Sequence, residues 1–155
     1  MTDERFVSCA KQYMDMVFRI AYGYLKNSSD AEDVTQEVLL RLYRTETDFV
    51  SEEHRKRWLI RVTVNCCKSL FRAPWRQQEN LDDYAETLGF EREDYTALFT
   101  AVMGLERKYR VPLLLYYFEG YSVREIGELL RLPENTVSTR LRRARAKLKD
   151  MLTEE

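Results

Sequence analysis

The sequence predicts an all-α protein of two small helical domains joined by an acidic linker. The chain has 155 residues with only five Gly and three Pro, too few for a turn-rich β-sandwich. Apolar residues recur at the spacing of amphipathic helices along most of its length. Charge is segregated, with a net −6 over residues 76–106 and +4 over 107–155. We therefore expect domains at 1–75 and 95–155, and a linker at 76–94.

The first domain is predicted to begin with two helices. Helical spacing of apolar residues covers Phe6–Leu25, after which Asn27-Ser28-Ser29 interrupts the pattern. Ser29 and Glu32 have the spacing of a capping box, so a second helix is expected from there to about Arg44.

A third helix is predicted over Arg57–Arg72, after the polar stretch Thr45–Lys56. Pro74 ends it, because proline cannot continue a helix and disfavours helical backbone before it. Its apolar side is expected to consist of Leu59, Val62, Cys66 and Leu70, with Trp58 beside them.

The second domain is predicted to open with helices at Tyr95–Gly104 and Arg107–Phe118, with Pro112 in the first turn of the latter. Ser122 and Glu125 then form another capping-box pattern.

A helix-turn-helix motif is predicted at the end of the chain. The helix that starts at Ser122 ends at Leu130, and four residues separate it from a final helix, Asn135–Leu152. Gly127 is placed to let the two helices approach closely. The final helix has an apolar stripe of Val137, Leu141, Ala144, Leu148 and Leu152.

The final helix is strongly basic. Six Lys or Arg residues lie between Arg140 and Lys149, with no acidic residue among them. Such crowding favours a polyanion as partner, although a solvated basic face would have the same pattern. The candidate DNA-binding residues are Ser138, Thr139, Arg140, Arg142, Arg143 and Arg145.

The third helix carries a second basic stripe opposite its apolar side. Its members are Arg57, Arg61, Asn65, Lys68 and Arg72. Cations suit phosphates and the Asn amide suits base edges, while an ordinary wet face is the other interpretation. Arg55 and Lys56 add charge at its start, and Trp58 is either a stacking surface or part of the core.

The second helix presents acidic and amide side chains, notably Asp33, Gln36 and Glu37, followed by Arg41. This face could dock a basic partner or be merely solvated. A carboxylate metal centre of the di-iron type is disfavoured, because those bundles use several Glu-x-x-His pairs and His54 is the only histidine.

Together, these features resemble the sigma-70 family of transcription factors, of the small extracytoplasmic-function (ECF) type. Asp30–Arg44 (DAEDVTQEVLLRLYR) resembles the family's core-polymerase-binding helix. Arg57–Arg72 (RWLIRVTVNCCKSLFR) resembles the helix that engages the −10 promoter element, and Tyr121–Lys149 resembles the −35-binding helix-turn-helix.

The resemblance implies bacterial core RNA polymerase, promoter DNA and an anti-sigma factor as partners. It assigns Asp33, Gln36, Glu37 and Arg41 to the clamp helices of the polymerase. The basic stripe of the third helix would face the −10 element, and Phe49–Lys56 matches the family's specificity loop. The acidic linker would lie in the basic RNA path of the polymerase.

The resemblance implies no catalytic residue, cofactor or metal. A stand-alone helix-turn-helix regulator and a metal-dependent helical-bundle enzyme are the competing hypotheses. Cys9, Cys66 and Cys67 contain no C-x-x-C pair, which argues against a zinc site or a disulfide framework. We expect a cytoplasmic protein without membrane insertion, since no apolar run reaches about 18 residues and no signal peptide is evident.

Overall fold

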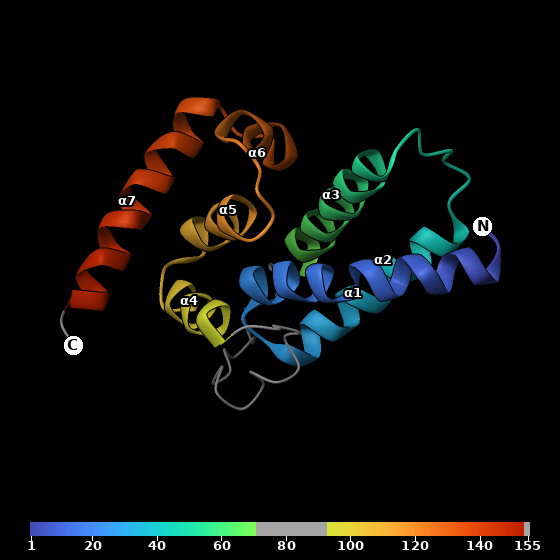
Figure 1. Ribbon diagram of the computed structural model, residues 1–155, viewed down its shortest axis with the longest axis horizontal. Coiled ribbons are helices and arrows are strands. Elements are labelled where there is room, and N and C mark those ends of the chain that lie inside the picture. The colour runs from blue at the N-terminus through green and yellow to red at the C-terminus, as the bar shows by residue number, and fades with distance from the viewer. Residues whose placement is uncertain (71–92, 154–155) are drawn as a thin grey trace. The chain divides into compact units, whose positions relative to one another are not determined.

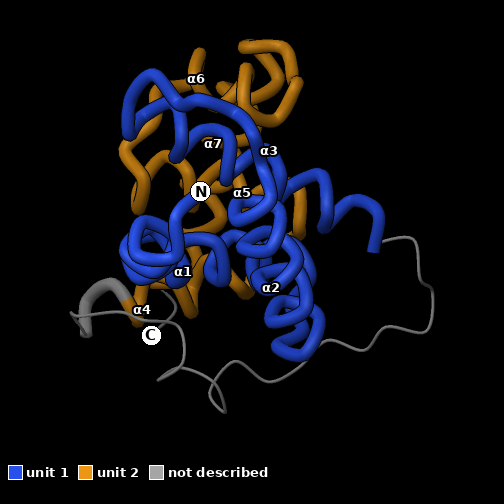
Figure 2. Tube along the Cα trace, turned by 90° about the vertical axis from the view of Figure 1, so that its right-hand side faces the viewer, with its two compact units in different colours: residues 1–80 blue, residues 81–155 orange. Residues whose placement is uncertain are grey.

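The computed structural model describes residues 1–70 and 93–153, and these form seven helices and no strand (Figure 1). The all-α prediction is thereby confirmed. The chain divides into two compact units, Met1–Asn80 and Leu81–Glu155 (Figure 2). Arg72 and the predicted linker up to residue 92 lie outside the described residues.

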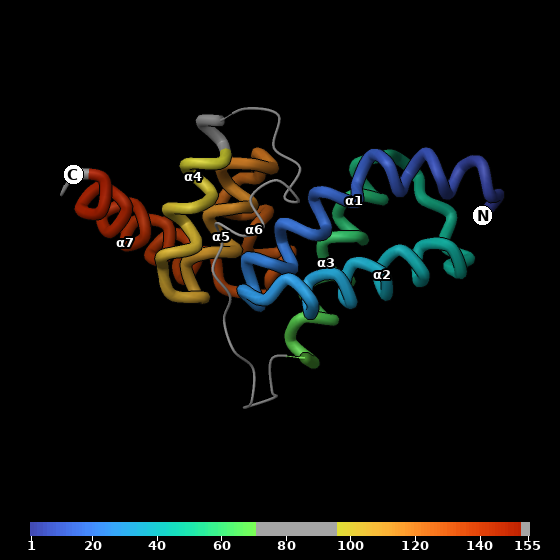
Figure 3. The backbone as a smooth tube through the Cα atoms, turned by 90° about the horizontal axis from the view of Figure 1, so that it is seen from below, coloured from blue at the N-terminus to red at the C-terminus, as the bar shows by residue number. Residues whose placement is uncertain are grey.

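Unit 1 contains α1 (Asp3–Leu25), α2 (Ser28–Arg44) and α3 (Glu52–Leu70). The first two form an antiparallel pair that runs side by side in Figure 3. The hydroxyl of Tyr43 near the end of α2 donates to Asp3 Oδ1 at the start of α1, at 2.7 Å.

The turn between α1 and α2 differs from the predicted capping box. Lys26 adopts a left-handed conformation (φ 50°), and its N–H donates to the carbonyl of Tyr22 to close α1. Asn27 is the N-cap of α2, with its side-chain oxygen accepting from the Asp30 N–H at 3.0 Å. The second helix therefore begins before Ser29, and the predicted cap at that residue is wrong.

The third helix begins five residues earlier than predicted, at Glu52. Ser51 starts it, because its Oγ accepts from the His54 N–H at 3.0 Å. Glu52 and Glu53 occupy the first turn, where negative charge is favourable next to the positive end of the helix dipole.

The core of unit 1 is aliphatic and aromatic. It includes Val17, Ile20 and Tyr22 of α1, Val34, Val38 and Leu42 of α2, and Leu59, Ile60, Val64, Cys66 and Cys67 of α3. The predicted apolar side of the third helix is only partly right, since Val62 and Leu70 are half-buried. Because α3 packs against both α1 and α2, its buried face is wider than the single predicted stripe and also includes Ile60, Val64 and Cys67.

Unit 2 contains α4 (Glu93–Met103), α5 (Arg107–Tyr117), α6 (Val123–Leu130) and α7 (Glu134–Thr153). Pro112 lies inside α5 and not in its first turn, which corrects the prediction.

The predicted capping box of α6 is confirmed. Ser122 Oγ accepts from the Glu125 N–H at 3.2 Å, and Glu125 Oε1 accepts from the Ser122 N–H at 3.0 Å. Arg131, in a left-handed conformation (φ 57°), ends the helix. A Cβ on Gly127 would lie 2.9 Å from the Leu132 carbonyl oxygen, so this glycine lets the turn approach α6 closely.

The apolar stripe of α7 is confirmed for four of its five predicted members. Val137, Leu141, Ala144 and Leu148 are buried, but Leu152 is 61% exposed because the final turn lies at the rim of the core. No helix among the described residues has the length and apolar character needed to cross a membrane.

Candidate nucleic-acid and partner interfaces

The polar face of α2 is intact in the structure. Asp33, Gln36, Glu37 and Arg41 are all exposed. Asp33, Glu37 and Arg41 follow one another at intervals of four residues along one side of the helix, and Gln36 lies one turn after Asp33, beside Glu37. Glu37 Oε1 accepts from Arg41 Nε at 2.9 Å, with each side chain about half exposed. This i, i+4 pair holds two of the four predicted docking residues in a defined arrangement.

An apolar groove adjoins this polar face and was missed by the sequence analysis. It is a shallow pocket of about 390 Å³ lined by Phe6, Gln36, Leu39, Leu40 and Tyr43. The Phe6 and Tyr43 rings meet edge to face, with their centroids 5.1 Å apart. The neighbouring Leu39 and Leu40 were a usable signal, because adjacent helical residues cannot both point into one core.

The basic stripe of α3 is brought together on one side of the helix. Arg61, Asn65 and Lys68 are exposed, whereas Arg57 is half-buried. The Nε of Arg57 lies 3.1 Å from Glu53 Oε1, so part of its charge is neutralised by the first turn. Arg72, the last predicted member, lies outside the described residues.

Trp58 supports the loop that precedes α3. It is half-buried and meets the ring of Phe49 edge to face, with centroids 5.5 Å apart. Phe49 also packs edge to face against His54, at 5.2 Å. The Val50 N–H donates to His54 Nδ1 at 3.2 Å, and the Val50 side chain is left 88% exposed.

Arg55 does not add to the basic stripe, contrary to expectation. It is only 3% exposed, its guanidinium pairs with the Glu52 carboxylate, and it lies 5.1 Å from the centroid of the Phe49 ring. The Tyr13 hydroxyl donates to Glu52 Oε2 at 2.8 Å. Arg55 therefore fastens the loop and the start of α3 to α1.

The titration properties of this cluster follow from its contacts. Burial, followed by the hydrogen bond to Glu52, raises the pKa of Tyr13 to about 12. The same hydrogen bond, followed by the pairing with Arg55, lowers the pKa of Glu52. The carboxylate is thus held in its charged form.

The six candidate residues of α7 do not share one face. Thr139, which is half-buried, and the exposed Arg142 and Arg143 lie on the side away from the apolar stripe, whereas the exposed Ser138 lies toward the flank of Arg145, two turns earlier. Arg145 lies on one flank, where its Nε donates to the Tyr117 hydroxyl at 3.0 Å.

The guanidinium of Arg145 also lies 4.9 Å from the centroid of the Tyr116 ring. Both contacts join α7 to the end of α5. The geometry therefore separates Arg145 from the residues that face outward.

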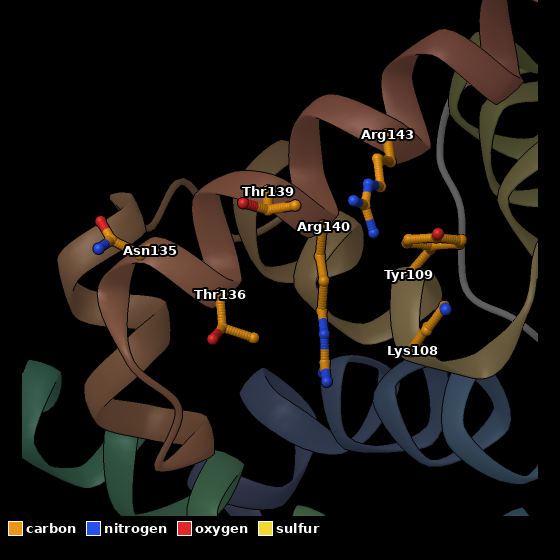
Figure 4. Close-up of a pocket in the computed structure, with 7 residues that line it drawn as sticks. All are labelled: Lys108, Tyr109, Asn135, Thr136, Thr139, Arg140 and Arg143. Atoms are coloured by element: carbon orange, nitrogen blue, oxygen red, sulfur yellow. The ribbon is translucent and has the colours of Figure 1, made fainter.

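Arg140 lies on the opposite flank of α7 and lines a polar pocket of about 370 Å³ (Figure 4). The start of α5 supplies Lys108 and Tyr109 to this pocket. The first half of α7 supplies Asn135, Thr136, Thr139, Arg140 and Arg143. Sequence analysis missed Lys108, because it lies outside the helix-turn-helix.

Glu106 lies next to this pocket, two residues before Lys108. Its Oε1 lies 3.2 Å from Lys147 Nζ, and its Oε2 lies 3.7 Å from Lys108 Nζ. Lys147, followed by Lys108, lowers the pKa of Glu106. Among the described residues, no three His, Cys, Asp or Glu side chains come together as a metal site.

Two family models match the chain, one within each compact unit. Residues 9–77 match the family model of sigma-70 region 2, and residues 95–148 match that of sigma-70 region 4. The chain is 29% identical over 157 residues to the RNA polymerase sigma factor SigV of Bacillus subtilis (strain 168), covering 99% of this chain and 95% of SigV.

The ECF RNA polymerase sigma factor SigW of the same organism is 28% identical over 167 residues, covering 96% of this chain and 89% of SigW. A structural relative is the sigma factor RpoE in complex with the anti-sigma factor NepR from Bartonella quintana. Its TM-score is 0.72 at 18% identity, with 97% of this chain and 98% of that chain covered.

Proposed function

Because the chain belongs to the sigma-70 family, as an RNA polymerase sigma factor of the ECF type, we propose how its two units divide the work of initiation. Unit 1 binds bacterial core RNA polymerase and the −10 element, and unit 2 binds the −35 element. Domains at 1–75 and 95–155, with a tether at 76–94, are the corresponding functional boundaries.

The observation that carries this proposal is the face of α2. Asp33, Gln36 and Glu37 are exposed beside the groove that contains Leu40. An acidic face with an adjoining apolar groove repels the DNA backbone and suits a protein surface that is basic at its rim and apolar at its centre. A regulator that only binds DNA has no use for such a face.

DNA contacts belong to α3 and α7 in this proposal. Arg61, Asn65 and Lys68 face the −10 element, with Arg57 in a supporting position and Arg72 continuing the stripe. Trp58 orders the adjacent loop through Phe49. Capture of an unstacked base by such a loop would offset the cost of unpairing, a few kcal/mol, and so assist strand opening.

In unit 2, Ser138, Thr139, Arg142 and Arg143 contact base edges in the major groove of the −35 element. Nucleotidyl transfer is carried out by the polymerase, so the chain needs no catalytic residue or cofactor. It acts in the cytoplasm, where polymerase and promoter meet. NepR binds RpoE in the structural relative, and an anti-sigma factor is proposed as a partner here.

Co-elution with bacterial core RNA polymerase lacking sigma tests whether the polar face of α2 binds the polymerase. The wild-type chain should co-elute, and the double variant Asp33→Arg/Glu37→Arg should not. Asp15→Arg/Glu46→Arg is the matched control, because it reverses two exposed acidic residues away from this face and should co-elute. Loss of binding in the control, or retention in the test variant, would contradict the assignment.

A further inference from the structure

The pocket between α5 and α7 has the donor set of a phosphate site. Lys108 and Arg143 border it with Arg140, and the hydroxyls of Thr136 and Thr139 add neutral donors (Figure 4). Ammonium, guanidinium and hydroxyl groups are the side chains that hold DNA backbone oxygens.

The charge around the pocket is unbalanced. Three cations line it, and Lys147 lies on the same flank of α7 through its contact with Glu106. Glu106 is the carboxylate that opposes them, and it is shared between Lys147 at 3.2 Å and Lys108 at 3.7 Å. Lys108 is about half exposed, with its ammonium 3.7 Å from Glu106 Oε2 and 5.2 Å from the centroid of the Tyr109 ring. Both contacts are weak at such exposure, so the ammonium remains available to a stronger anion.

The position of the pocket indicates a backbone phosphate of DNA as the anion that it binds. It borders the N-terminal half of α7, on the flank next to the residues proposed to contact bases. A recognition helix inserted in the major groove has backbone phosphates along its flanks. The flank that carries Arg140 and faces Lys108 therefore lies where a phosphate runs.

We propose that this pocket holds one backbone phosphate of promoter DNA, with Lys108 and Arg140 as its cationic ligands. Lys108 extends the DNA-binding surface beyond the helix-turn-helix and fixes the register of α7 on the duplex. This inference rests on the proposed function of unit 2. Arg140 is thereby assigned to the backbone, whereas Ser138 and Arg142 contact bases.

Lys108→Gln in the full chain, assembled with core polymerase, tests the assignment. The probe is a promoter duplex selected by the wild-type holoenzyme from a random pool. The variant should bind more weakly with unchanged sequence preference. Because the variant makes one phosphate contact fewer, it releases fewer counterions and its affinity depends less on salt. The ratio of wild-type to variant affinity should therefore fall about threefold between 50 and 200 mM salt.

Two control pairs separate the pocket from general charge effects. Lys11→Gln removes one exposed positive charge from α1 and should leave affinity unchanged. Glu106→Gln removes the competing carboxylate and should tighten binding, whereas Asp15→Asn, an equal charge change on α1, should not.

Replacement of single phosphates of the duplex by methylphosphonate locates the contact. At one position the substitution should weaken the Lys108→Gln complex clearly less than the wild-type complex, because in the variant only Arg140 remains as a cationic ligand of that phosphate. The proposal is overturned if Lys108→Gln matches Lys11→Gln, if it changes sequence preference, or if no single phosphate is coupled to it. Failure of the wild-type holoenzyme to select any duplex would instead contradict the proposed function.

Discussion

Loss of Glu52 should destabilise unit 1 more than loss of Arg55, although the two residues form one ion pair. The side chain of Arg55 is 4% exposed and that of Glu52 is 60% exposed. Removing the carboxylate leaves a buried cation without its counter-ion. Removing the guanidinium leaves a carboxylate that water already solvates.

The contacts set the expected magnitudes. Arg55→Met keeps apolar bulk beside Phe49 and loses a cation–π contact, so unfolding should become easier by about 1 kcal/mol or less. Glu52→Ala should cost about 3 kcal/mol, the low end for breaking a buried pair, because the carboxylate is open to solvent. The Tyr13 hydroxyl also loses its acceptor, and about 1 kcal/mol of that total belongs to this hydrogen bond.

Urea unfolding at neutral pH, followed by circular dichroism, measures both variants. Glu53→Ala is the control, because it removes the partly exposed pair with Arg57 and the same kind of first-turn charge that Glu52→Ala removes, and it should cost about 1 kcal/mol or less. A larger loss for Arg55→Met than for Glu52→Ala would refute the reasoning. The buried charge itself would then be a net source of stability.

Three further predictions concern other contacts. Gly127→Ala should lower the stability of unit 2 by about 1 kcal/mol in urea unfolding, since a steric clash of about 2 kcal/mol exceeds the helix-propensity gain of about 1 kcal/mol. Gly104→Ala is the milder comparison, because its new Cβ meets mainly the flexible end of Met151. Equal losses of stability in the two variants would argue against the clash. Tyr13, with its pKa raised to about 12, contributes stability that is complete below pH 10 and is lost as pH rises toward 12. Tyr13→Phe should therefore flatten the alkaline loss of stability in unfolding measurements across that range, and an unchanged slope would contradict this. Arg145→Gln should weaken unit 2 by about 1 kcal/mol and leave the preferred −35 sequence unchanged in a duplex selection, whereas Arg142→Ala should change it.

The helical framework was predictable because periodicity is a local property of the chain. The capping box at Ser122 was confirmed, since both of its partners lie within one turn. The cap at Ser29 was wrong because Asn27, two residues earlier, competes for the same role. Leu152 fits the apolar period of α7, but a period does not reveal where the partner helices end.

The exposed surfaces were less predictable, because contacts between side chains far apart in sequence determine which residues face solvent. Arg55 has the same formal charge whether it faces water or Phe49, and Tyr13, its indirect partner through Glu52, lies on another helix. Lys108 likewise joins the flank of Arg140 only through the packing of α5 on α7.

The fixed loop before α3 has a consequence for binding affinity. Its tip is held by the bond from the Val50 N–H to His54 Nδ1, while Phe49 packs beneath it. Ordering one residue of a free loop costs about 1–2 kcal/mol in conformational entropy. A loop ordered during folding does not incur this cost again when it meets a ligand, so preorganisation leaves more of the contact energy of Val50 to appear as affinity.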